Sequence, residues 1–289
     1  MIKREVSRAY TAAEEQGFLG EDHKARALIQ VPFPESDPFI LLMDDVLDKK
    51  DNGPVGGPHP HAGFETVSLL LNGEIGDQRH KMKAGDLQLM TAGRGIVHSE
   101  VIEKKSTMRL LQLWLNLPKK DRWASPKVQD LAYDRVPLVS REGVNIRVYS
   151  GSLAGATSPV INHTPLILAD IRLEAGAKTI LRLPASYSTF LYVLEGCVNV
   201  GDNQKTLGQH QVGWLDRFSG EEESELLLTT GEIAARLVLY AGQPQHDEII
   251  HHGPFIADGK EDIQRLYREY RAGQLLHIAE VDKAHVFTH

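Results

Sequence analysis

The sequence is poor in cysteine, in long apolar runs and in concentrated positive charge. Its 289 residues contain one cysteine, Cys197, so no intrachain disulfide can form. No stretch approaches the roughly 18 apolar residues of a membrane span, and the first residues lack the pattern of a secretory signal. These absences exclude a disulfide scaffold and argue against membrane insertion, and they predict a protein of the reducing cytoplasm.

The charge balance argues against direct nucleic-acid binding. The chain has 32 Lys and Arg residues against 39 Asp and Glu residues, a formal net charge of −7, and no dense basic block. Nucleic-acid binding depends on a concentrated positive surface, which this composition does not supply. Hydrophobic residues (42%) and charged residues (25%) are at globular levels. The thirteen histidines are the unusual feature, so their spacing carries the most information about function.

Short apolar segments, separated by Gly, Pro, Asn and Asp, recur along most of the chain. Strands separated by turn residues at this frequency are typical of a β-sandwich or barrel. The clearest predicted strands are Phe39–Met43, Thr66–Leu71, Asp86–Met90, Leu110–Leu115, Phe190–Leu194 and Ala234–Tyr240. The sequence therefore predicts an all-β protein.

One segment near the end has helical periodicity instead. Ile263, Leu266, Tyr267 and Tyr270 recur at spacings that place them on one face of a helix. A capping box formed by Asp258 and Glu261 and a C-terminal stop at Gly273 predict a short helix over residues 259–272.

A repeated pattern indicates two similar domains. The segment Thr66–Gly73 and the segment Thr189–Gly196 each end in a polar-glycine turn, and a second glycine turn follows in each half. Two tandem barrels of one type would produce this pattern. We expect a first barrel over 1–130 and a second over 131–289, the second including the short helix. The Pro-containing segment 119–137 is the expected linker.

Two pairs of side chains have the spacing of metal ligands on strands. His59 and His61 are two residues apart, as are His98 and Glu100, so each pair leaves one face of a strand with Cα atoms ~6.6–6.8 Å apart. If the two strands are neighbours, three imidazoles and one carboxylate converge. That donor set suits Fe(II), Mn(II), Ni(II) or Cu(II), whereas a structural zinc site would more often use thiolates.

The same residues belong to motifs that resemble the pirin family, within the cupin superfamily. The segment from Gly53 to Gly73 is similar to the first cupin motif, with one extra residue before its last glycine. The stretches that resemble pirins are Asp37–Asp44, His59–Ser68, Gly85–Glu100, Leu111–Asn116 and His252–Phe255. The long stretch Gly85–Glu100 is the most specific of them, and together they extend over most of the chain.

The resemblance implies a bicupin of two β-barrels with one divalent metal in the first barrel. Iron(II) is the metal expected in preference to manganese, nickel, copper or cobalt. The same resemblance implies His59, His61, His98 and Glu100 as the metal ligands. Glu65 occupies the carboxylate position of many other cupins, and we expect it behind the ligands or as an alternative ligand. In the second barrel the equivalent positions hold Arg182, Pro184 and Ser188, which cannot form this site.

Two functions from different classes follow from the resemblance. The first is O2-dependent cleavage of a flavonol such as quercetin, a quercetin 2,3-dioxygenase activity in which Glu100 is also the catalytic base. The second is regulatory binding, in which the metal state controls docking to a partner protein without catalysis. A closed structural metal site fits less well, because four protein ligands leave two octahedral positions free. The resemblance also implies a monomer.

Several other histidines and the cysteine receive non-catalytic interpretations. We expect His80, in a loop between Glu74 and Lys83 that is short for a pirin, to be exposed to solvent rather than to contact substrate. His246, His251 and His252 are assigned to packing, and Cys197 to the role of a small apolar residue.

Overall fold

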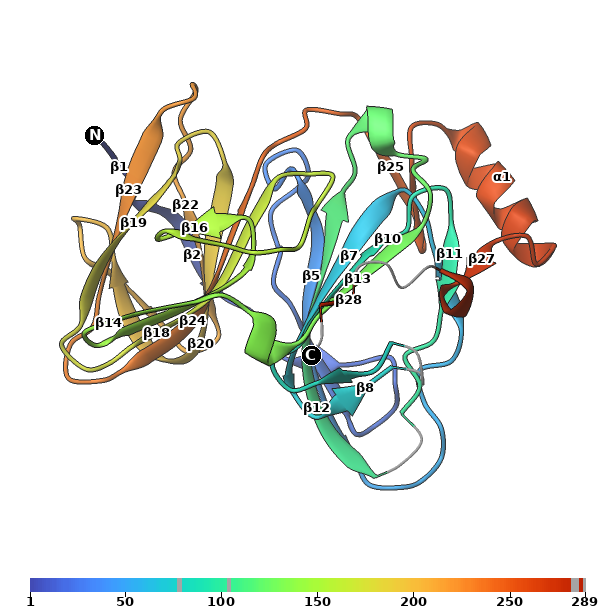
Figure 1. Ribbon diagram of the computed structural model, residues 1–289, viewed down its shortest axis with the longest axis horizontal. Coiled ribbons are helices and arrows are strands. Elements are labelled where there is room, and N and C mark those ends of the chain that lie inside the picture. Colours follow the sequence, from blue (N-terminus) through green and yellow to red (C-terminus); the bar gives the residue numbers. More distant parts are fainter. Residues whose placement is uncertain (77–79, 103–104, 282–285, 288–289) are drawn as a thin grey trace. The chain divides into compact units, whose positions relative to one another are not determined.

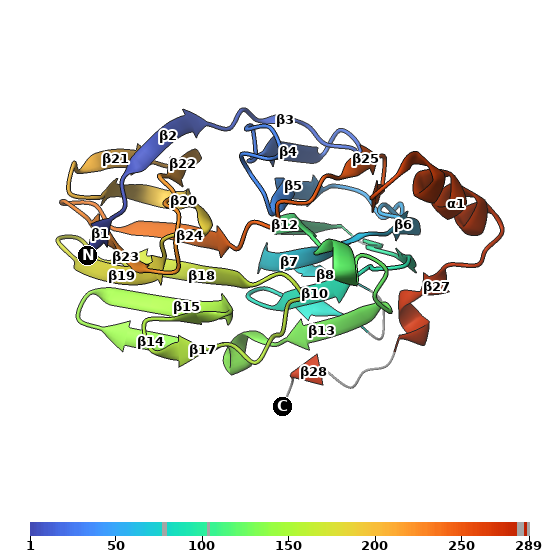
Figure 2. The ribbon, with the colours of Figure 1, turned by 90° about the horizontal axis from the view of Figure 1, so that it is seen from above.

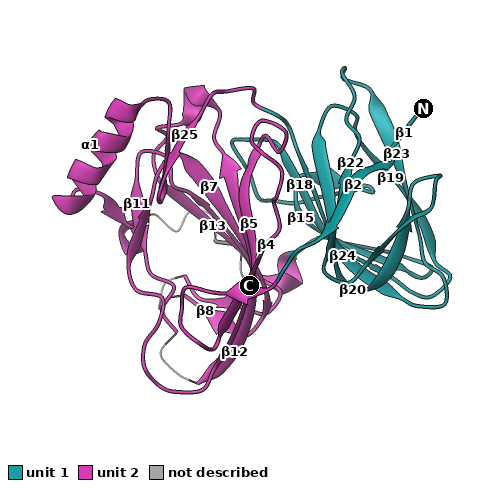
Figure 3. Cartoon of the chain, turned by 180° about the vertical axis from the view of Figure 1, so that it is seen from behind, with its two compact units in different colours: residues 1–13, 136–244 teal, residues 14–135, 245–289 magenta. Residues whose placement is uncertain are grey.

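The computed structural model describes residues 1–76, 80–102, 105–281 and 286–287 (Figure 1). In this part of the chain, short antiparallel strands dominate and there is one α-helix. The chain forms two compact units, which Figure 3 colours separately. Unit 1 consists of residues 1–13 and 136–244, and unit 2 of residues 14–135 and 245–289.

The two units differ from the expected domains at both ends of the chain. The expected boundary after residue 130 lies close to the observed one after residue 135, but each unit also takes one chain end. Figure 2 shows the first two strands, β1 (Ile2–Lys3) and β2 (Val6–Thr11), among the strands of unit 1. They are there because β1 pairs with β23 (Glu223–Thr229) and β2 with β22 (Gln211–Leu215).

Unit 2 is built on an eight-stranded sheet in the order β28-β13-β10-β7-β12-β5-β4-β3, with a three-stranded sheet β27-β11-β6 and the pairs β25-β26 and β8-β9. The bounds are β3 (Glu15–Gln16), β4 (His23–Ala27), β5 (Phe39–Lys49), β6 (His59–His61), β7 (Phe64–Asn72), β8 (Glu74–Ile75), β9 (Met82–Lys83), β10 (Leu87–Thr91), β11 (Ile96–His98), β12 (Ser106–Asn116), β13 (Lys127–Leu131), β25 (Ile250–His252), β26 (Phe255–Ala257), β27 (Leu276–His277) and β28 (Val286–Phe287). Short 3-10 turns are η1 (Lys119–Asp121), η2 (Tyr133–Arg135) and η3 (Ile278–Glu280).

Unit 1 is an eleven-stranded arrangement whose main path runs β1-β23-β20-β24-β18-β15-β14. Its other strands are bounded as β14 (Leu138–Arg141), β15 (Val144–Ser150), β18 (Leu166–Leu173), β19 (Lys178–Pro184), β20 (Ser188–Val200), β21 (Lys205–Gly208) and β24 (Ala235–Gly242). A separate two-stranded sheet is formed by β16 (Ser152–Leu153) and β17 (Ala156–Thr157). Alternate residues of these strands point inward, and the resulting aliphatic core includes Ile146, Leu181, Leu191 and Leu237.

The predicted repeat corresponds to equivalent strands in the two units. In unit 2, β7 lies between β10 and β12, both antiparallel to it. In unit 1, β20 lies between β22 and β24 in the same sense. In each unit one of these partners is the strand that comes after the second glycine turn. The expected all-β fold with two cupin-type units is confirmed.

The single helix, α1 (Lys260–Arg271), matches the predicted helix within one residue at each end. Its buried residues Ile263 and Leu266 pack against Phe255 and Ala257 of β26, so α1 belongs to unit 2. The predicted capping box is wrong. Gly259 is the N-cap and makes no side-chain cap.

The expected linker is wrong over much of its length. Residues 127–131 form β13, which pairs along its whole length with β10 and buries Val128 and Leu131. The strand has only five residues and follows Pro126 directly, so it is hard to recognise without its partner. Among the described residues, no helix has the length and apolar character needed to cross a membrane.

Candidate metal centre

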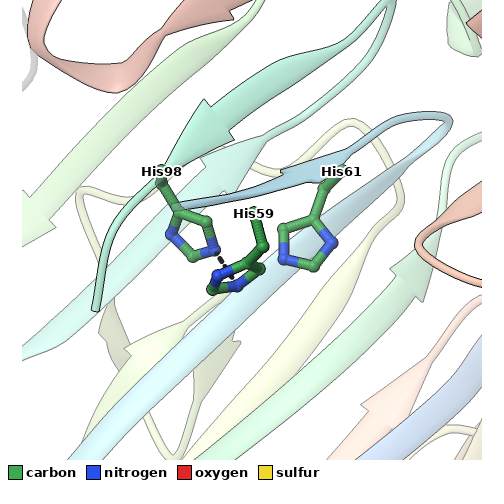
Figure 4. A group of neighbouring side chains, drawn as sticks. All are labelled: His59, His61 and His98. Atoms are coloured by element: carbon green, nitrogen blue, oxygen red, sulfur yellow. Dashed lines mark hydrogen bonds between the residues drawn. The ribbon is translucent and has the colours of Figure 1, made fainter. Parts of the chain in front are cut away.

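The predicted ligand histidines lie on two neighbouring strands. β6 and β11 pair antiparallel, with His98 directly opposite His59 and Ile96 opposite His61. The interpretation from spacing required these strands to be neighbours, and they are. Figure 4 shows the three imidazoles directed toward one another from the two strands.

The three histidines are close enough to share one ion. Their potential ligand atoms, one from each ring, all lie within 4.8 Å of one another. Nε2 of His98 lies 2.9 Å from Nε2 of His59, so one ring donates a hydrogen bond to the other when no ion separates them. The ring centroid of His61 is 5.0 Å from that of His59 and 4.9 Å from that of His98.

Burial keeps two of the rings uncharged. The pKa of His98 is lowered to about 3, mainly by burial and further by the neighbouring His59. The pKa of His61 is lowered well below its ordinary value for the same first reason, with His98 and His59 adding to the effect. A metal therefore meets neutral imidazoles with available lone pairs and displaces no proton from these two groups.

His61 has ring nitrogens that the described protein does not satisfy. Both are fully buried and neither makes a hydrogen bond of acceptable geometry to any described residue. The carbonyl of Pro254 lies near the ring and slightly favours its charged form, but it does not meet that geometry. Buried polar atoms almost always have a partner, and a coordinated ion supplies one for a histidine. The donor set and this orphaned ring fit a cupin-type metal site.

Glu100 lies beside the three histidines, but it is not on the strand face that its spacing from His98 predicts. β11 ends at His98, so Glu100 comes after the strand instead of sharing its face. One carboxylate oxygen is 3.9 Å from Nε2 of His59, and the other accepts a hydrogen bond of 2.7 Å from Nε2 of Gln112. Burial raises the pKa of Glu100, while His59 and the Gln112 bond oppose that shift. Glu100 is therefore a neighbour of the three clustered histidines and not a member of the cluster.

The two secondary candidates occupy structural positions in unit 2. Glu65 is fully buried on β7 and accepts a hydrogen bond of 2.9 Å from the Thr91 hydroxyl, and it is not among the three clustered ligands. The expectation that His80 is exposed is wrong. Only 3% of His80 is accessible, because Nδ1 pairs with the Asp130 carboxylate at 2.7 Å.

Several contributors to the site could not be recognised in the sequence. Trp114 stacks on Phe64 with centroids 4.3 Å apart, and both rings pack against His61 at 5.3 Å. His23 and Asp45 form a buried pair at 2.9 Å. Trp114 and Gln112 come from β12, whose pairing with β7 and β5 brings them to the site, so only a strand-pairing prediction could have found them.

Two small cavities adjoin Glu100. One has a volume of about 20 Å³ and is also lined by His80 and His98. The other has a volume of about 30 Å³ and extends from Glu100 past Asp45 and His23 to Phe18. A single water needs roughly 10–15 Å³ of such space, so each cavity has room for one or two waters.

The equivalent positions in unit 1 are occupied differently. Arg182 extends toward solvent beside Glu225, and the buried hydroxyl of Ser188 accepts a hydrogen bond from Arg217. Within the part of unit 1 that the structure describes, no group of three histidine, cysteine or carboxylate side chains is close enough to hold an ion.

Two family models match the chain. The model described as Pirin matches residues 24–115, and the model described as Pirin C-terminal cupin domain matches residues 168–276. The first match contains all four predicted ligands. The second begins in unit 1 and ends after α1, so it crosses from one unit to the other.

Curated relatives and solved structures are similar over most of the chain. Pirin of Rattus norvegicus is 37% identical over 247 residues, which are 81% of each protein. A Pseudomonas aeruginosa protein provisionally named as a quercetin 2,3-dioxygenase is 35% identical over 259 residues, 84% of this chain and 89% of that protein. The crystal structure of quercetin 2,3-dioxygenase from Acinetobacter baumannii superposes with a TM-score of 0.82 and 29% identity, covering 95% of this chain and 98% of that one.

Proposed function

This chain belongs to the pirin family, and we propose that it is a metal-dependent dioxygenase that opens the ring of a flavonol such as quercetin. The observation that carries the proposal is the buried cluster of His59, His61 and His98 with the Glu100 carboxylate beside it. The similarity to proteins named as quercetin 2,3-dioxygenases supplies the substrate class.

In this proposal, one divalent transition metal is held by His59, His61, His98 and Glu100. Iron(II) is the metal that we expect, and manganese, nickel, copper and cobalt are also compatible with the donor set. When bound, the metal supplies Lewis acidity toward the flavonol oxygens and the electronic means of bringing O2 into reaction. The protein keeps His61 and His98 neutral, and it packs Phe64 and Trp114 against His61, which excludes water from that side of the ring.

Glu100 has the properties of the base that removes the flavonol hydroxyl proton. Burial raises its pKa and so makes the carboxylate a stronger proton acceptor than an exposed one. Gln112 donates to one oxygen and leaves the other directed toward His59. A flavonol hydroxyl near the histidines would therefore meet the free oxygen of Glu100.

Substrate entry requires movement of part of the wall. The cavity of about 30 Å³ beside Glu100 holds water but is too small for a flavonol. Phe18 and Leu19 line its outer end, and Phe18 is 79% exposed. We expect this segment to move aside, after which Phe18 offers an aromatic face to the flavonol rings.

The test is an oxygen-consumption assay with the purified, iron-loaded protein. Addition of quercetin should produce O2 uptake together with loss of the flavonol absorbance, and both should vanish in His59→Ala. Glu100→Gln should retain much of the metal and lose activity by about 100-fold, the usual contribution of a general base. Wild-type rates in Glu100→Gln would remove the catalytic role of this carboxylate.

The narrow cavity favours a second candidate, regulatory binding without catalysis. In that case the metal would bias the surface that a partner protein recognises, and no substrate would have to enter. A fully iron-loaded protein that consumes no O2 with quercetin or related flavonols would support this role and contradict the dioxygenase proposal. Metal analysis of the same sample separates this outcome from simple loss of iron.

A further inference from the structure

A broad groove lies between α1 and β25 in unit 2 and shares no lining residue with the cavities beside Glu100. Its volume is about 780 Å³. The residues that decide its character are three cations, Lys260, Arg268 and Arg271, and three apolar or aromatic groups, Ile250, Ile263 and Tyr267. The remaining lining residues are polar or histidine, and none is acidic.

The three cations lie on one face of α1. At 100° per residue, positions 260, 268 and 271 fall within a sector of about 80°, and Tyr267 lies about 20° outside it. None of the three makes an ion pair with any residue that the structure describes, although Arg271 lies over the Tyr267 ring with 5.8 Å between its guanidinium carbon and the centroid. Positive charge is thus concentrated here on a chain of net charge −7.

Two of the three acidic residues of the helix pair away from the groove. Asp262 and Glu269 pair with Arg265 at 3.4 and 3.2 Å, and Arg265 also stacks over Trp123 at 4.6 Å. The third, Glu261, is exposed beside Lys260 and does not line the groove. Arg265 therefore has its charge compensated on its own face of α1. The groove cations have no such compensation within the described chain and face solvent.

The floor of the groove is apolar and firmly supported. Ile263 is almost fully buried against β26, and Tyr267 packs edge-on against Phe255 with centroids 4.9 Å apart. His252 also contacts the Tyr267 ring, at 5.7 Å. A ligand at this surface would meet a rigid apolar strip bordered by positive charge.

We propose that this groove binds an acidic segment of a partner protein in an extended conformation. The cations at 260 and 271 are separated by about 16 Å along the helix axis, the length of about five residues of extended chain. Carboxylates of the segment would pair with Lys260, Arg268 and Arg271, and an apolar side chain would lie on Ile250, Ile263 and Tyr267. The proposal does not depend on the metal or on catalysis.

A peptide fits these features better than a nucleic acid does. Single-stranded nucleic acid is bound by several stacking aromatic residues along a positive path. The groove offers Tyr267 as its one large aromatic ring, and the net negative charge of the chain opposes a long polyanion. Alternating acidic and apolar side chains match the cationic border and apolar floor.

Fluorescence anisotropy with a labelled octapeptide of alternating glutamate and leucine tests the proposal on the full-length, metal-loaded protein. Binding should weaken about tenfold in the double variant R268E/R271E, a change of about 1.4 kcal/mol. Peptide binding should also weaken when ionic strength rises, because it depends on attraction between solvent-exposed charges. The milder R268Q/R271Q should weaken it less.

The matched control is K178E/K205E, which makes the same charge change on exposed strands of unit 1. It should bind the peptide within about twofold of wild type, because neither lysine lines the groove and exposed charges beyond contact range are screened by salt. Circular dichroism and metal content verify that each variant is folded.

Three results would overturn the proposal. One is no binding of the glutamate-leucine peptide at millimolar concentration, and another is equal binding by wild type and R268E/R271E. The third is tighter binding of a twelve-nucleotide RNA, lost in the same variant, which would assign the groove to nucleic acid instead.

Discussion

At the residue scale, the main property of the metal centre is that two of its histidines are buried without charge. His98 has a pKa of about 3 and His61 a pKa well below its ordinary value, both chiefly through burial. The unfolded chain binds protons on these histidines below about pH 6.5, whereas the folded chain does not until the pH is much lower. Their contribution to stability is therefore complete above pH 6.5 and is lost as the pH falls toward 3.

This sign gives a measurable prediction for the metal-free protein. When the pH falls from 8 to 5, the free energy of unfolding should decrease by about 2 kcal/mol because of His98 alone. The reason is that His98 takes up a proton in this range only in the unfolded chain. In the variant His98→Gln, the decrease in the free energy of unfolding between pH 8 and pH 5 should be smaller than in the wild type by about the same 2 kcal/mol. Urea unfolding of chelator-treated protein at the two pH values measures both quantities.

His163→Gln provides the control, since His163 is exposed in unit 1. Its pH dependence should match that of the wild type. An equal loss of stability in His98→Gln and in the wild type would show that the burial of His98 is not linked to protonation.

Spacing was sufficient to predict the three histidines but not their surroundings. A two-residue separation fixes a shared strand face locally, so His59 and His61 could be paired from the sequence, and pairing of β6 with β11 brought His98 to them. Gln112 and Trp114 reach the site through long-range pairing of β12. His80 was misjudged because its partner, Asp130, comes from β13, a strand that the sequence did not reveal.

At the element scale, the turn between β6 and β7 holds the histidine strand in position. Gly63 in this turn has φ +85°, and a Cβ added there would lie 1.9 Å from the carbonyl oxygen of Ile256 in β26. The close approach lets Ala62 accept a hydrogen bond of 2.9 Å from the Ile256 amide. β26 thus supports the segment that carries His61.

Gly63→Ala should therefore damage both stability and metal binding. The left-handed backbone costs an alanine roughly 1–2 kcal/mol, and separation from β26 should raise the total loss to about 2–4 kcal/mol. Metal bound per chain, measured by mass spectrometry after dialysis against a fixed free-metal level, should fall.

Gly57→Ala is the matched control, because a Cβ at that position meets nothing within 4 Å. It lies two residues before His59, so it tests whether any glycine near the histidines is equally sensitive. Similar metal loss in both variants would contradict the role assigned to β26.

Element prediction succeeded where a pattern was long and failed where it was short. The periodicity of Ile263 and Leu266 identified α1, and the apolar runs within β7, β12 and β20 identified the central strands. β13 has only five residues and begins directly after Pro126, so it is too short to show a period. The helix cap was misplaced because Asp258 instead accepts a hydrogen bond from Arg122.

At the scale of the whole molecule, each compact unit includes a segment from the far end of the chain. Residues 1–13 complete unit 1, and their anchor is Arg4, whose side chain is fully buried. It donates hydrogen bonds to the carbonyls of Ala185 and Tyr187 and to the hydroxyl of Thr189 at 2.7–2.9 Å. Burial lowers its pKa to about 10, so Arg4 stays charged at neutral pH.

Arg4→Met should destabilise the protein by about 3 kcal/mol, because it leaves buried oxygen acceptors without a donor. The metal bound per chain should stay the same, since His59, His61 and His98 belong to unit 2. Chemical unfolding and metal analysis of one preparation check both statements. Arg172→Met, at an exposed position of unit 1, is the control and should change neither quantity. Loss of metal in Arg4→Met would show that the metal site depends on unit 1.

Composition and repeats could not predict that residues 1–13 belong to the same unit as residues 136–244, or that residues 245–289 belong to the other unit. A tandem pattern places its boundary between the repeats, and the observed boundary after residue 135 agrees with it closely. Nothing in the short segment Ile2–Thr11 distinguishes β1 and β2 as strands of the later unit. Their pairing with β23 and β22 decides this, and such long-range pairing leaves little local trace.

The position of β26 also sets an order of events during synthesis. The ribosome delivers the three imidazoles early, then all of residues 136–244, and only afterwards Pro254 and Ile256, which close over His61 and Gly63. A nascent chain consequently exposes an unfinished centre throughout translation of unit 1. We therefore expect chains that end before β26 to bind a metal more weakly than the full chain does.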